Sequence, residues 1–524
     1  MKEAKKAIII GGGLSGLTAG IYLKKYGFDV EILEKNAYMG GLCTGWVRKG
    51  SYIDGCIHWL TESNHGELHE VMREIGALGD DVKVTHLEAY SQAVVNGKEV
   101  NFYLDPDRFE KELMSFATKN DVPKVKMLIK FVRKFKLNLI TAGNPYHLWT
   151  LWEKIKFISR IVRLISVFKG GTKLTIEDFA NSLESEELRF AFRNTFVPNH
   201  YSLFSFANTM GGICDFNSGI PEGGSKAFAQ RMVDKFTSLG GKIRTSCPVE
   251  KIVIDGDKAT GVALKNGEII SADYVIPACD VHYTQEILLE KKFTITQIAE
   301  AEKEKTDYPS FSLFMVSFRT KKDVSRLNPN RYIKCDEYDV LGEKCNCIYM
   351  KHFGYDKTLS TNGQTVVQAY MESSEAMFDK LNAMTHDEYK AFKADFTAKI
   401  TEIVEKTVGD EYGELEYLDV CTPITFNKWT NAYKGTFMTH MLSKNSKQII
   451  LRNDILPLRN VAMAGHWMMM PGGVPVAIMQ GKFAAMSIRY MNQNPNKFDM
   501  NKAIQRLHQP LKRESGHSMF KRES

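Results

Sequence analysis

Ala7-Ile-Ile-Ile10 is followed by Gly11-Gly-Gly-Leu-Ser-Gly16 and, after a run typical of a helix, by Val30-Glu-Ile-Leu-Glu34. The first apolar run predicts a buried parallel strand. The next stretch is a G-x-G-x-x-G turn, in which one glycine makes the tight turn, one lets a pyrophosphate approach and one lets helix and strand pack closely. Those glycines are Gly11, Gly13 and Gly16. The sequence therefore predicts a dinucleotide site.

The residues around this turn support that interpretation. Leu14 and Ser15 open the helix, where unpaired backbone N–H groups and the positive end of the dipole are expected to face phosphates. Glu34 ends the second strand, close to the spacing of about 20 residues expected for the acid that binds a ribose hydroxyl. The alternative is a glycine-rich turn without a ligand.

The composition limits the classes of protein. The chain has 524 residues, and this length allows about three domains. It is 44% hydrophobic and 25% charged, as in soluble globular proteins. The chain shows no membrane-spanning run and leaves no room for a cleaved signal peptide. Nine cysteines without a C-x-x-C pair indicate reduced thiols in a cytoplasmic protein, without a metal site.

A second glycine pair follows the acid. The sequence continues as Glu34-Lys35, then Gly40-Gly41-Leu42, and adjacent glycines let the backbone pass close to a cofactor. E-K-x(4)-G-G after such a unit resembles the flavoprotein superfamily of amine oxidases, phytoene desaturases and Rab GDP-dissociation inhibitors. The resemblance implies FAD and assigns Lys35, Gly40, Gly41 and Leu42 to its site. Leu42 stands where the family often has Arg.

A further stretch, Gly50 to Trp59, contains Asp54-Gly-Cys-Ile-His58. It resembles the F-D-x-G-I-H-Y segment of carotenoid isomerases and retinol saturases, with Cys56 replacing glycine. The resemblance implies that His58 lies beside the flavin, where a neutral imidazole can donate a hydrogen bond or move a proton, and that Trp59 borders the substrate. The alternative for His58 is a hydrogen-bonded core histidine.

Two later segments also carry the resemblance. Residues 220–280 resemble the family's return to the nucleotide domain, which implies that the backbone of Val249 lies beside the adenine. Asn460 to Pro475 resembles the phytoene desaturase ending, which implies cofactor contacts from Gly465, Gly472, Gly473 and Val474. The helix that follows is expected to aim its N-terminus at the flavin and stabilise negative charge on the ring. His466 is a second catalytic candidate.

The substrate cavity is expected to be lined by aromatic and methionine side chains. Thr422 to Gly435 resembles the family's T-P-x-T segment at the substrate cavity, and methionines provide a soft, adaptable wall for a long apolar ligand. Aromatic side chains there can stack on an extended substrate or belong to the core, and both interpretations stay open. The predicted cavity residues are Trp59, Phe426, Trp429, Tyr433, Met468, Met469 and Met470.

Positive charge is concentrated in one part of the chain. Residues 124–173 hold twelve Lys and Arg against a single acid, Glu153, whereas the whole chain has a net charge of +7. Apolar residues recur there at helical spacing, with Trp149 and Trp152 at one edge. Basic amphipathic helices with Trp and Phe are typical of a membrane interface. A solvated basic face over an ordinary core is the alternative, and nucleic acid is not expected because no reading motif accompanies the charge.

These observations predict an α/β fold: a Rossmann-like, glutathione-reductase-like FAD-binding domain interleaved with an α+β substrate domain. The FAD domain is discontinuous, over residues 1–90, 216–285 and 446–492. The substrate domain covers 91–215 and 286–445, begins with a hairpin turning at Asn96-Gly97, and includes the basic helices of 124–173. Residues 493–524 form a polar C-terminal tail.

The predicted function is that of an FAD-dependent oxidoreductase that desaturates, saturates or isomerises carbon–carbon bonds of a long isoprenoid, carotenoid-like or fatty acyl substrate. Hydride would pass between a substrate carbon and flavin N5, while the protein supplies orientation. A flavin amine oxidase and a non-catalytic lipid- or prenyl-binding carrier are the alternatives. The expected location is the cytoplasm, peripherally on the inner face of the membrane. The sequence makes no prediction of the oligomeric state.

Overall fold

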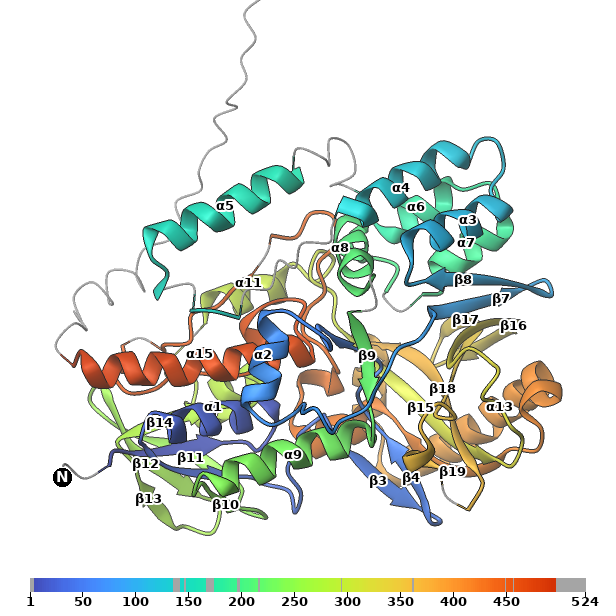
Figure 1. Ribbon diagram of the computed structural model, residues 1–524. Coiled ribbons are helices and arrows are strands. Elements are labelled where there is room, and N and C mark those ends of the chain that lie inside the picture. Colours follow the sequence, from blue (N-terminus) through green and yellow to red (C-terminus); the bar gives the residue numbers. More distant parts are fainter. Residues whose placement is uncertain are drawn as a thin grey trace, which may run out of the picture.

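The computed structural model describes residues 4–134, 142–145, 148–165, 174–195, 198–214, 217–293, 295–360, 362–447, 449–455 and 457–495. Within them, two main β-sheets lie side by side, with helices packed around both (Figure 1). The predicted tail lies outside the described residues from 496 onward, as do 135–141, 146–147 and 166–173 of the predicted basic region.

The first sheet is built from strands far apart in the sequence. It has the order β10, β2, β1, β14, and every pair is parallel. A parallel bridge between Val275 of β14 and Val461 extends this sheet beyond β14. Ile9 packs in a core with the helices of one face, and Ile8 packs in another core with a small antiparallel sheet. The predicted buried parallel strand and the α/β class are confirmed.

These layers have the following bounds. The strands are β1 (Lys6–Ile10), β2 (Asp29–Leu33), β10 (Lys242–Arg244) and β14 (Tyr274–Pro277). The helices of the first core are α1 (Leu14–Lys25), α2 (Glu67–Glu74), α9 (Gly224–Ser238) and α15 (Val474–Gln493). The small sheet contains β11 (Val249–Asp255), β12 (Lys258–Leu264) and β13 (Ile269–Ser271).

The second sheet has seven strands in the order β19, β15, β18, β17, β16, β7, β8, and its neighbouring strands are antiparallel except for β16 and β7. Side chains alternate between its faces. On β17, Ile348 and Met350 share a core with α13 (His386–Tyr412), whereas Tyr349 and Lys351 point to the opposite face. Its strands are β7 (Ala89–Val95), β8 (Lys98–Tyr103), β15 (Phe311–Thr320), β16 (Asn330–Val340), β17 (Glu343–His352), β18 (Thr365–Ser374) and β19 (Glu416–Cys421).

A helical layer lies above the edge of this sheet (Figure 1). Its helices share one apolar core, and Asp105 caps the first of them by accepting a hydrogen bond from the backbone N–H of Arg108 at 2.7 Å. The members are α3 (Pro106–Phe116), α4 (Val122–Lys134), α6 (Ile176–Ser182), α7 (Glu186–Arg193) and α8 (Leu203–Ile213). Of the apolar stripe predicted here, Val125, Leu128, Ile129 and Val132 on α4 are fully buried in this core, and Phe135 lies outside the described residues.

The other amphipathic helix of the basic region behaves differently. α5 (Leu151–Ile165) lies apart from the two sheets (Figure 1). Trp152 is 73% exposed, Ile155 47% and Ile158 58%, so no described residue buries this part of the apolar side. Helices of the described part of the chain are all too short or too polar to cross a bilayer.

The remaining elements are short. They are β3 (Gly45–Arg48), β4 (Ser51–Asp54), β5 (Leu60–Thr61), β6 (Val84–Thr85), β9 (Ser218–Pro221), α10 (Val281–Tyr283), η2 (Thr284–Leu288), α11 (Thr296–Lys303), η3 (Lys357–Leu359), α12 (Glu375–Asn382), α14 (Pro423–Thr430), η4 (Tyr433–Gly435) and η5 (His466–Met468).

A buried histidine joins several of these short elements. His282 on α10 places Nδ1 3.1 Å from Asp280 Oδ1 and Nε2 2.6 Å from Glu302 Oε1 on α11. Its ring stacks on Tyr433 at 3.9 Å and meets Trp467 edge-on at 4.7 Å. Burial opposes the charge of His282, but the hydrogen bonds to the two carboxylates outweigh it and raise its pKa to about 9.

This arrangement predicts a loss of stability at alkaline pH. A raised pKa means that the contribution of His282 is complete below the unfolded value, about 6.5, and disappears as the pH rises through about 9. The free energy at stake is on the order of 3 kcal/mol. In thermal melts between pH 6 and 10, His282→Phe should lower the melting temperature and flatten its decline above pH 6.5. His386→Gln, which changes an exposed histidine, should leave the wild-type decline intact.

Candidate functional site

The glycine turn after β1 and the second glycine pair meet in space. The backbone N–H of Gly40 donates to the carbonyl oxygen of Gly12 at 2.8 Å, and Gly13 bridges Gly40. A Cβ on Gly16 would lie 2.0 Å from the carbonyl oxygen of Gly11, so only glycine permits this helix–turn packing. A Cβ on Gly13 would meet no protein atom closer than 3.9 Å. The structure thus leaves open space at the position predicted for a pyrophosphate.

The predicted acid faces this turn. Glu34 is 5% exposed, and its carboxylate accepts hydrogen bonds from the backbone N–H groups of Gly12 and Asn36, both at 2.8 Å. The strand that leads to Val249 passes close by, since the N–H of Cys247 donates to the carbonyl oxygen of Glu34 at 2.8 Å. Val249 itself is buried, with its side chain in the core shared with Ile8.

Lys35 and Leu42 lie at the margin of this group. Lys35 Nζ donates to the carbonyl oxygen of Lys428 at 3.0 Å and to Asn431 Oδ1 at 2.7 Å, so its ammonium ties the turn to α14. Leu42 is partly exposed next to Gly41. The backbone of residues 40–41 therefore lies at the glycine turn, whereas the side chain of Lys35 contacts α14 and the residue after it.

The carboxy-terminal segment completes the arrangement. Ser15 Oγ donates to the carbonyl oxygen of Ala477 at 2.7 Å, and Gly481 contacts Ser15 and Thr18, so α1 and α15 run side by side in the same direction. Neither helix has a side-chain cap or an acidic residue in its first turn. Two positive helix ends therefore lie together, and their free N–H groups suit the phosphates and the ring of a dinucleotide. The predicted residues at this end are Leu14, Gly465, Gly472, Gly473 and Val474.

His58 lies against the second sheet. Its Nδ1 is 3.3 Å from both Lys351 Nζ and the Tyr349 hydroxyl, and its ring lies 5.5 Å from that of Tyr370. Burial, followed by the charge of Lys351, lowers the pKa of His58 well below its usual value. His58 is therefore a neutral imidazole. Its neighbour Trp59 meets Tyr90 edge-on at 4.8 Å.

Three tyrosines on neighbouring strands form a stacked row on the same face of the sheet. The rings of Tyr332 and Tyr349 stack at 4.4 Å, and those of Tyr349 and Tyr370 at 5.1 Å. Glu372, next along β18, retains exposed surface, yet burial and then the charge of Glu343 raise its pKa to about 7. We call the three tyrosines the tyrosine floor.

The other predicted cavity residues lie in different surroundings. Phe426 is partly buried and packs in a cluster with Tyr370, and Tyr433 stacks on His282. The carbonyl oxygen of Trp429 accepts a hydrogen bond from Asn36 Nδ2 at 2.9 Å, which places this residue near the acid of the glycine turn.

Two of the predicted methionines do not line a cavity. Met468 and Met470 have no exposed surface and pack in the core of the first sheet, because a flexible thioether fills an irregular gap there as readily as in a ligand site. Met469 keeps partial exposure. His466 is partly exposed, and burial lowers its pKa to about 4, so it too is a neutral imidazole.

Lys351, Tyr349 and Tyr370 were not predicted as site residues. The alternation of Cys347-Ile-Tyr-Met-Lys351 places Tyr349 and Lys351 on one face of a strand, and that signal is present in the sequence. Which face meets His58 depends on pairing across almost 300 residues, which no local pattern reveals.

Comparison with known proteins agrees with this geometry. The family described as flavin containing amine oxidoreductase matches residues 14–489. The chain is 25% identical to a phytoene desaturase of Neurospora crassa, over 72% of this chain and 60% of that protein. It is also 25% identical to a 1-hydroxycarotenoid 3,4-desaturase of a Flavobacterium species, over 92% of this chain and 98% of that one.

Solved structures share the fold. An oxidoreductase from Methanosarcina mazei is 18% identical with a TM-score of 0.57, and covers 93% of this chain and 100% of its own. A putrescine oxidase variant is 15% identical with a TM-score of 0.57, over 93% and 99%. The matched region spans only about 60% of the length of several phytoene desaturases. The match over residues 14–489 and the nucleotide fold identify FAD as the cofactor, and the chain belongs to the flavin containing amine oxidoreductase family.

Proposed function

We propose that this protein is an FAD-dependent oxidoreductase that forms, removes or shifts carbon–carbon double bonds in a long apolar substrate of the isoprenoid, carotenoid or fatty acyl class. The tyrosine floor carries this proposal. A row of three stacked rings presents its edges along the sheet face and suits an extended apolar chain, which gains from dispersion and from loss of water. The names of the desaturase relatives point to the same class of substrate.

The residues proposed to hold FAD are those whose geometry leaves room for it. The first turn of α1 and the space at Gly13 would hold the pyrophosphate, Glu34 the ribose and the backbone near Val249 the adenine. The N-terminus of α15, at Gly473 and Val474, would lie against the ring. When bound, FAD supplies hydride transfer, and the protein orients the substrate and excludes water.

A substitution at Gly13 tests the cofactor site. Gly13→Ala adds a methyl group that meets no protein atom closer than 3.9 Å, so the apoprotein should fold and melt like wild type. The same methyl group would occupy the proposed pyrophosphate position and should weaken FAD binding by about tenfold or more, that is by about 1.4 kcal/mol. Titration by flavin fluorescence measures this. Gly212→Ala, also in open space, is the matched control and should bind FAD normally.

The reaction itself is tested by the flavin spectrum under anaerobic conditions. Phytoene should bleach the oxidised enzyme, or all-trans-retinol should reoxidise the reduced enzyme, because either result shows electron exchange with a carbon–carbon bond. Bleaching by putrescine or benzylamine instead would favour an amine oxidase. A purified protein without bound flavin and without response to any of these compounds would favour a carrier.

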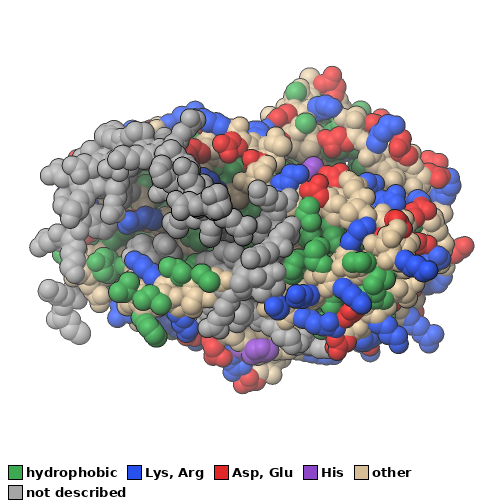
Figure 2. Space-filling view, turned by 90° about the horizontal axis from the view of Figure 1, so that it is seen from above, with side chains coloured by type: hydrophobic (Ala, Val, Ile, Leu, Met, Phe, Trp, Pro, Cys, Tyr) green, Lys and Arg blue, Asp and Glu red, His purple; other side chains and the backbone are tan. Residues whose placement is uncertain are grey.

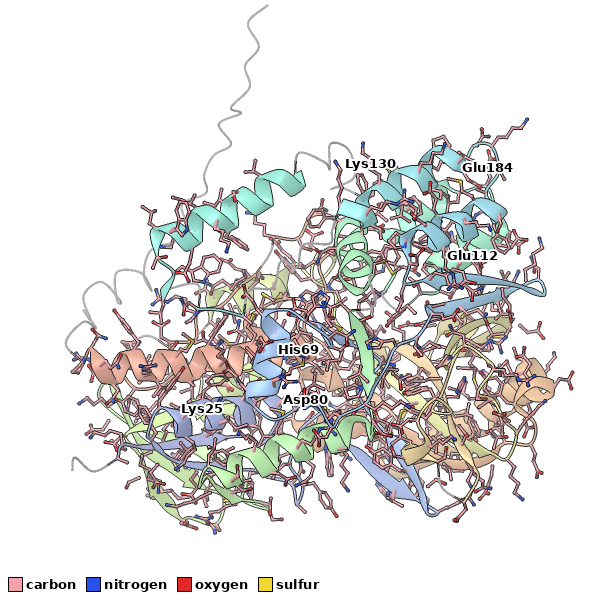
Figure 3. The ribbon with its side chains drawn as sticks, in the orientation of Figure 1. Lys25, His69, Asp80, Glu112, Lys130 and Glu184 are labelled. Carbon is pink, nitrogen blue, oxygen red and sulfur yellow. The ribbon has the colours of Figure 1, made fainter. Side chains whose placement is uncertain are left out.

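We also propose that α5 docks on an anionic membrane surface, from which an apolar substrate can enter. Its apolar side is exposed and is accompanied by exposed Lys154 and Lys156. Lys130 on α4 is exposed as well and points away from the second sheet (Figure 3). In Figure 2, hydrophobic and basic side chains lie near one another on the left of the face seen from above. Each cation near such a surface contributes about 1 kcal/mol.

Vesicle sedimentation tests this docking. Wild type should bind vesicles that contain phosphatidylserine, and binding should weaken with salt and be much lower with phosphatidylcholine alone. The double variant Trp152→Glu/Ile155→Glu should bind about tenfold more weakly, because it places charge on the apolar side of α5. Ile269→Glu, which alters an exposed apolar residue on β13, should bind like wild type. Equal binding by all three proteins would contradict the proposal.

A further inference from the structure

Lys351 lies in an unusual environment for a lysine. It is 1% exposed in β17, at the sheet face that meets His58. Within the described residues its ammonium has no carboxylate at ion-pair distance, and the hydrogen bond found for it is with His58 Nδ1 at 3.3 Å. Burial lowers its pKa to about 8, and the charge of Asp54 opposes this shift. A buried cation with such weak pairing is costly and is typically retained for a function.

The surrounding hydrogen bonds determine which nitrogen of His58 carries the proton. Asn330 Nδ2 donates to the carbonyl oxygen of Tyr90 at 3.0 Å, which turns Asn330 Oδ1 toward Tyr349. The Tyr349 hydroxyl donates to that oxygen at 2.9 Å and therefore has no proton left for His58. Lys351 is the remaining donor to Nδ1. Since the neutral ring accepts at Nδ1, it carries its proton on Nε2.

The second nitrogen of the His58 ring has no hydrogen-bond partner among the described residues. His58 keeps partial exposure, and its ring stands edge-on to Tyr370 at 5.5 Å, beside the tyrosine floor. Nε2 has no acceptor among the described residues and is not one of their buried, unpaired atoms. The Nε2–H group is therefore free to donate to a bound molecule.

We propose that Lys351 is a positioning residue that holds His58 in the Nε2–H tautomer and, through it, supplies the proton that accompanies hydride transfer to a substrate double bond. This inference rests on the proposed function. Reduced FAD, when bound, would supply hydride to one carbon of the double bond, and the other carbon would then require a proton. That carbon takes the proton of His58 Nε2, while Nδ1 takes one from Lys351. After product release, solvent protonates Nε2 and Nδ1 returns its proton to Lys351.

The other titratable groups that face this pair are compatible with the transfer. Asp54 and Cys56 approach from β4 and the residues after it, Tyr349 from β17 and Tyr370 from β18. Asp54 favours the protonated form of Lys351. Burial raises the pKa of both tyrosines, so they stay neutral around neutral pH. Lys351 is expected to change charge near pH 8.

The tautomer is tested without any turnover. Histidine-selective ¹⁵N NMR of the FAD-loaded protein, with His58 assigned by difference from His58→Gln, should show Nε2 protonated and Nδ1 unprotonated. Lys351→Met should lose this state and give a mixture of tautomers, and Lys351→Arg should restore it. Tyr349→Phe is the matched control, because it removes the other neighbour of Nδ1 without removing a donor. An Nδ1-protonated wild type, or an unchanged Lys351→Met, would overturn the inference.

The proton transfer is tested with reduced enzyme and all-trans-retinol or phytoene. The wild-type rate of saturation should fall as the pH rises through about 8, because Lys351 must be protonated to donate. Lys351→Met should be about 100-fold slower and lose that inflection. Lys351→Arg keeps the donor to Nδ1 but does not release a proton, so it should preserve the tautomer and yet remain slow. A wild-type profile that Lys351→Met leaves unchanged would refute the relay.

The two proposals fail in different ways. If neither olefin reacts with the wild-type enzyme, the proposed function fails, while the NMR spectrum still decides whether Lys351 fixes the tautomer of His58. If wild type reacts but the Lys351 variants keep its pH profile and its tautomer, the function stands and Lys351 has no part in it.

Discussion

The arrangement of the site depends on one buried carboxylate. Asp54 is 3% exposed and accepts hydrogen bonds from the backbone N–H of Ser225 at 2.6 Å and from its hydroxyl at 2.7 Å. Its own carbonyl oxygen accepts from Gln368 Nε2 at 2.9 Å. Burial raises its pKa, and the donors oppose this shift. An unpaired carboxylate at this depth would be strongly destabilising, so β4, α9 and the second sheet are held in one fixed relation. The position of His58 follows from that relation.

Histidines show how neighbours rather than burial alone decide a charge. His282 is buried between two carboxylates and is a cation with a pKa of about 9. His440, fully buried beside it without hydrogen-bond partners for either nitrogen among the described residues, has a pKa of about 4. His58 is neutral next to a lysine. One residue type therefore serves as an ionic link, a packing group and a hydrogen-bond donor in the same chain.

Much of the fold could be predicted from local patterns, and the rest depended on long-range packing. A strand, a glycine turn and a helix specify the first layer, and Asn96-Gly97 specifies the β7–β8 hairpin, because each signal lies within a few residues. The α4 and α5 stripes are similar in sequence, yet only α4 has α3 and α8 to cover it. The proposed role of Lys351 depends on the strand register, which places its ammonium next to His58. The burial of Met468 in the core likewise depends on long-range packing.

The pairing of the first helix with the last has a consequence for how the protein is made. Ser15 and Ala477 are 462 positions apart, and they touch at the place where the two helix ends come together. The ribosome synthesises the first of these helix ends long before the second. The nucleotide-binding fold therefore stays incomplete through most of translation. Contacts of such high sequence separation also close slowly. A flavin that binds at both helix ends, as proposed above, would therefore be captured late in biogenesis and would join the first and last helices of the described chain.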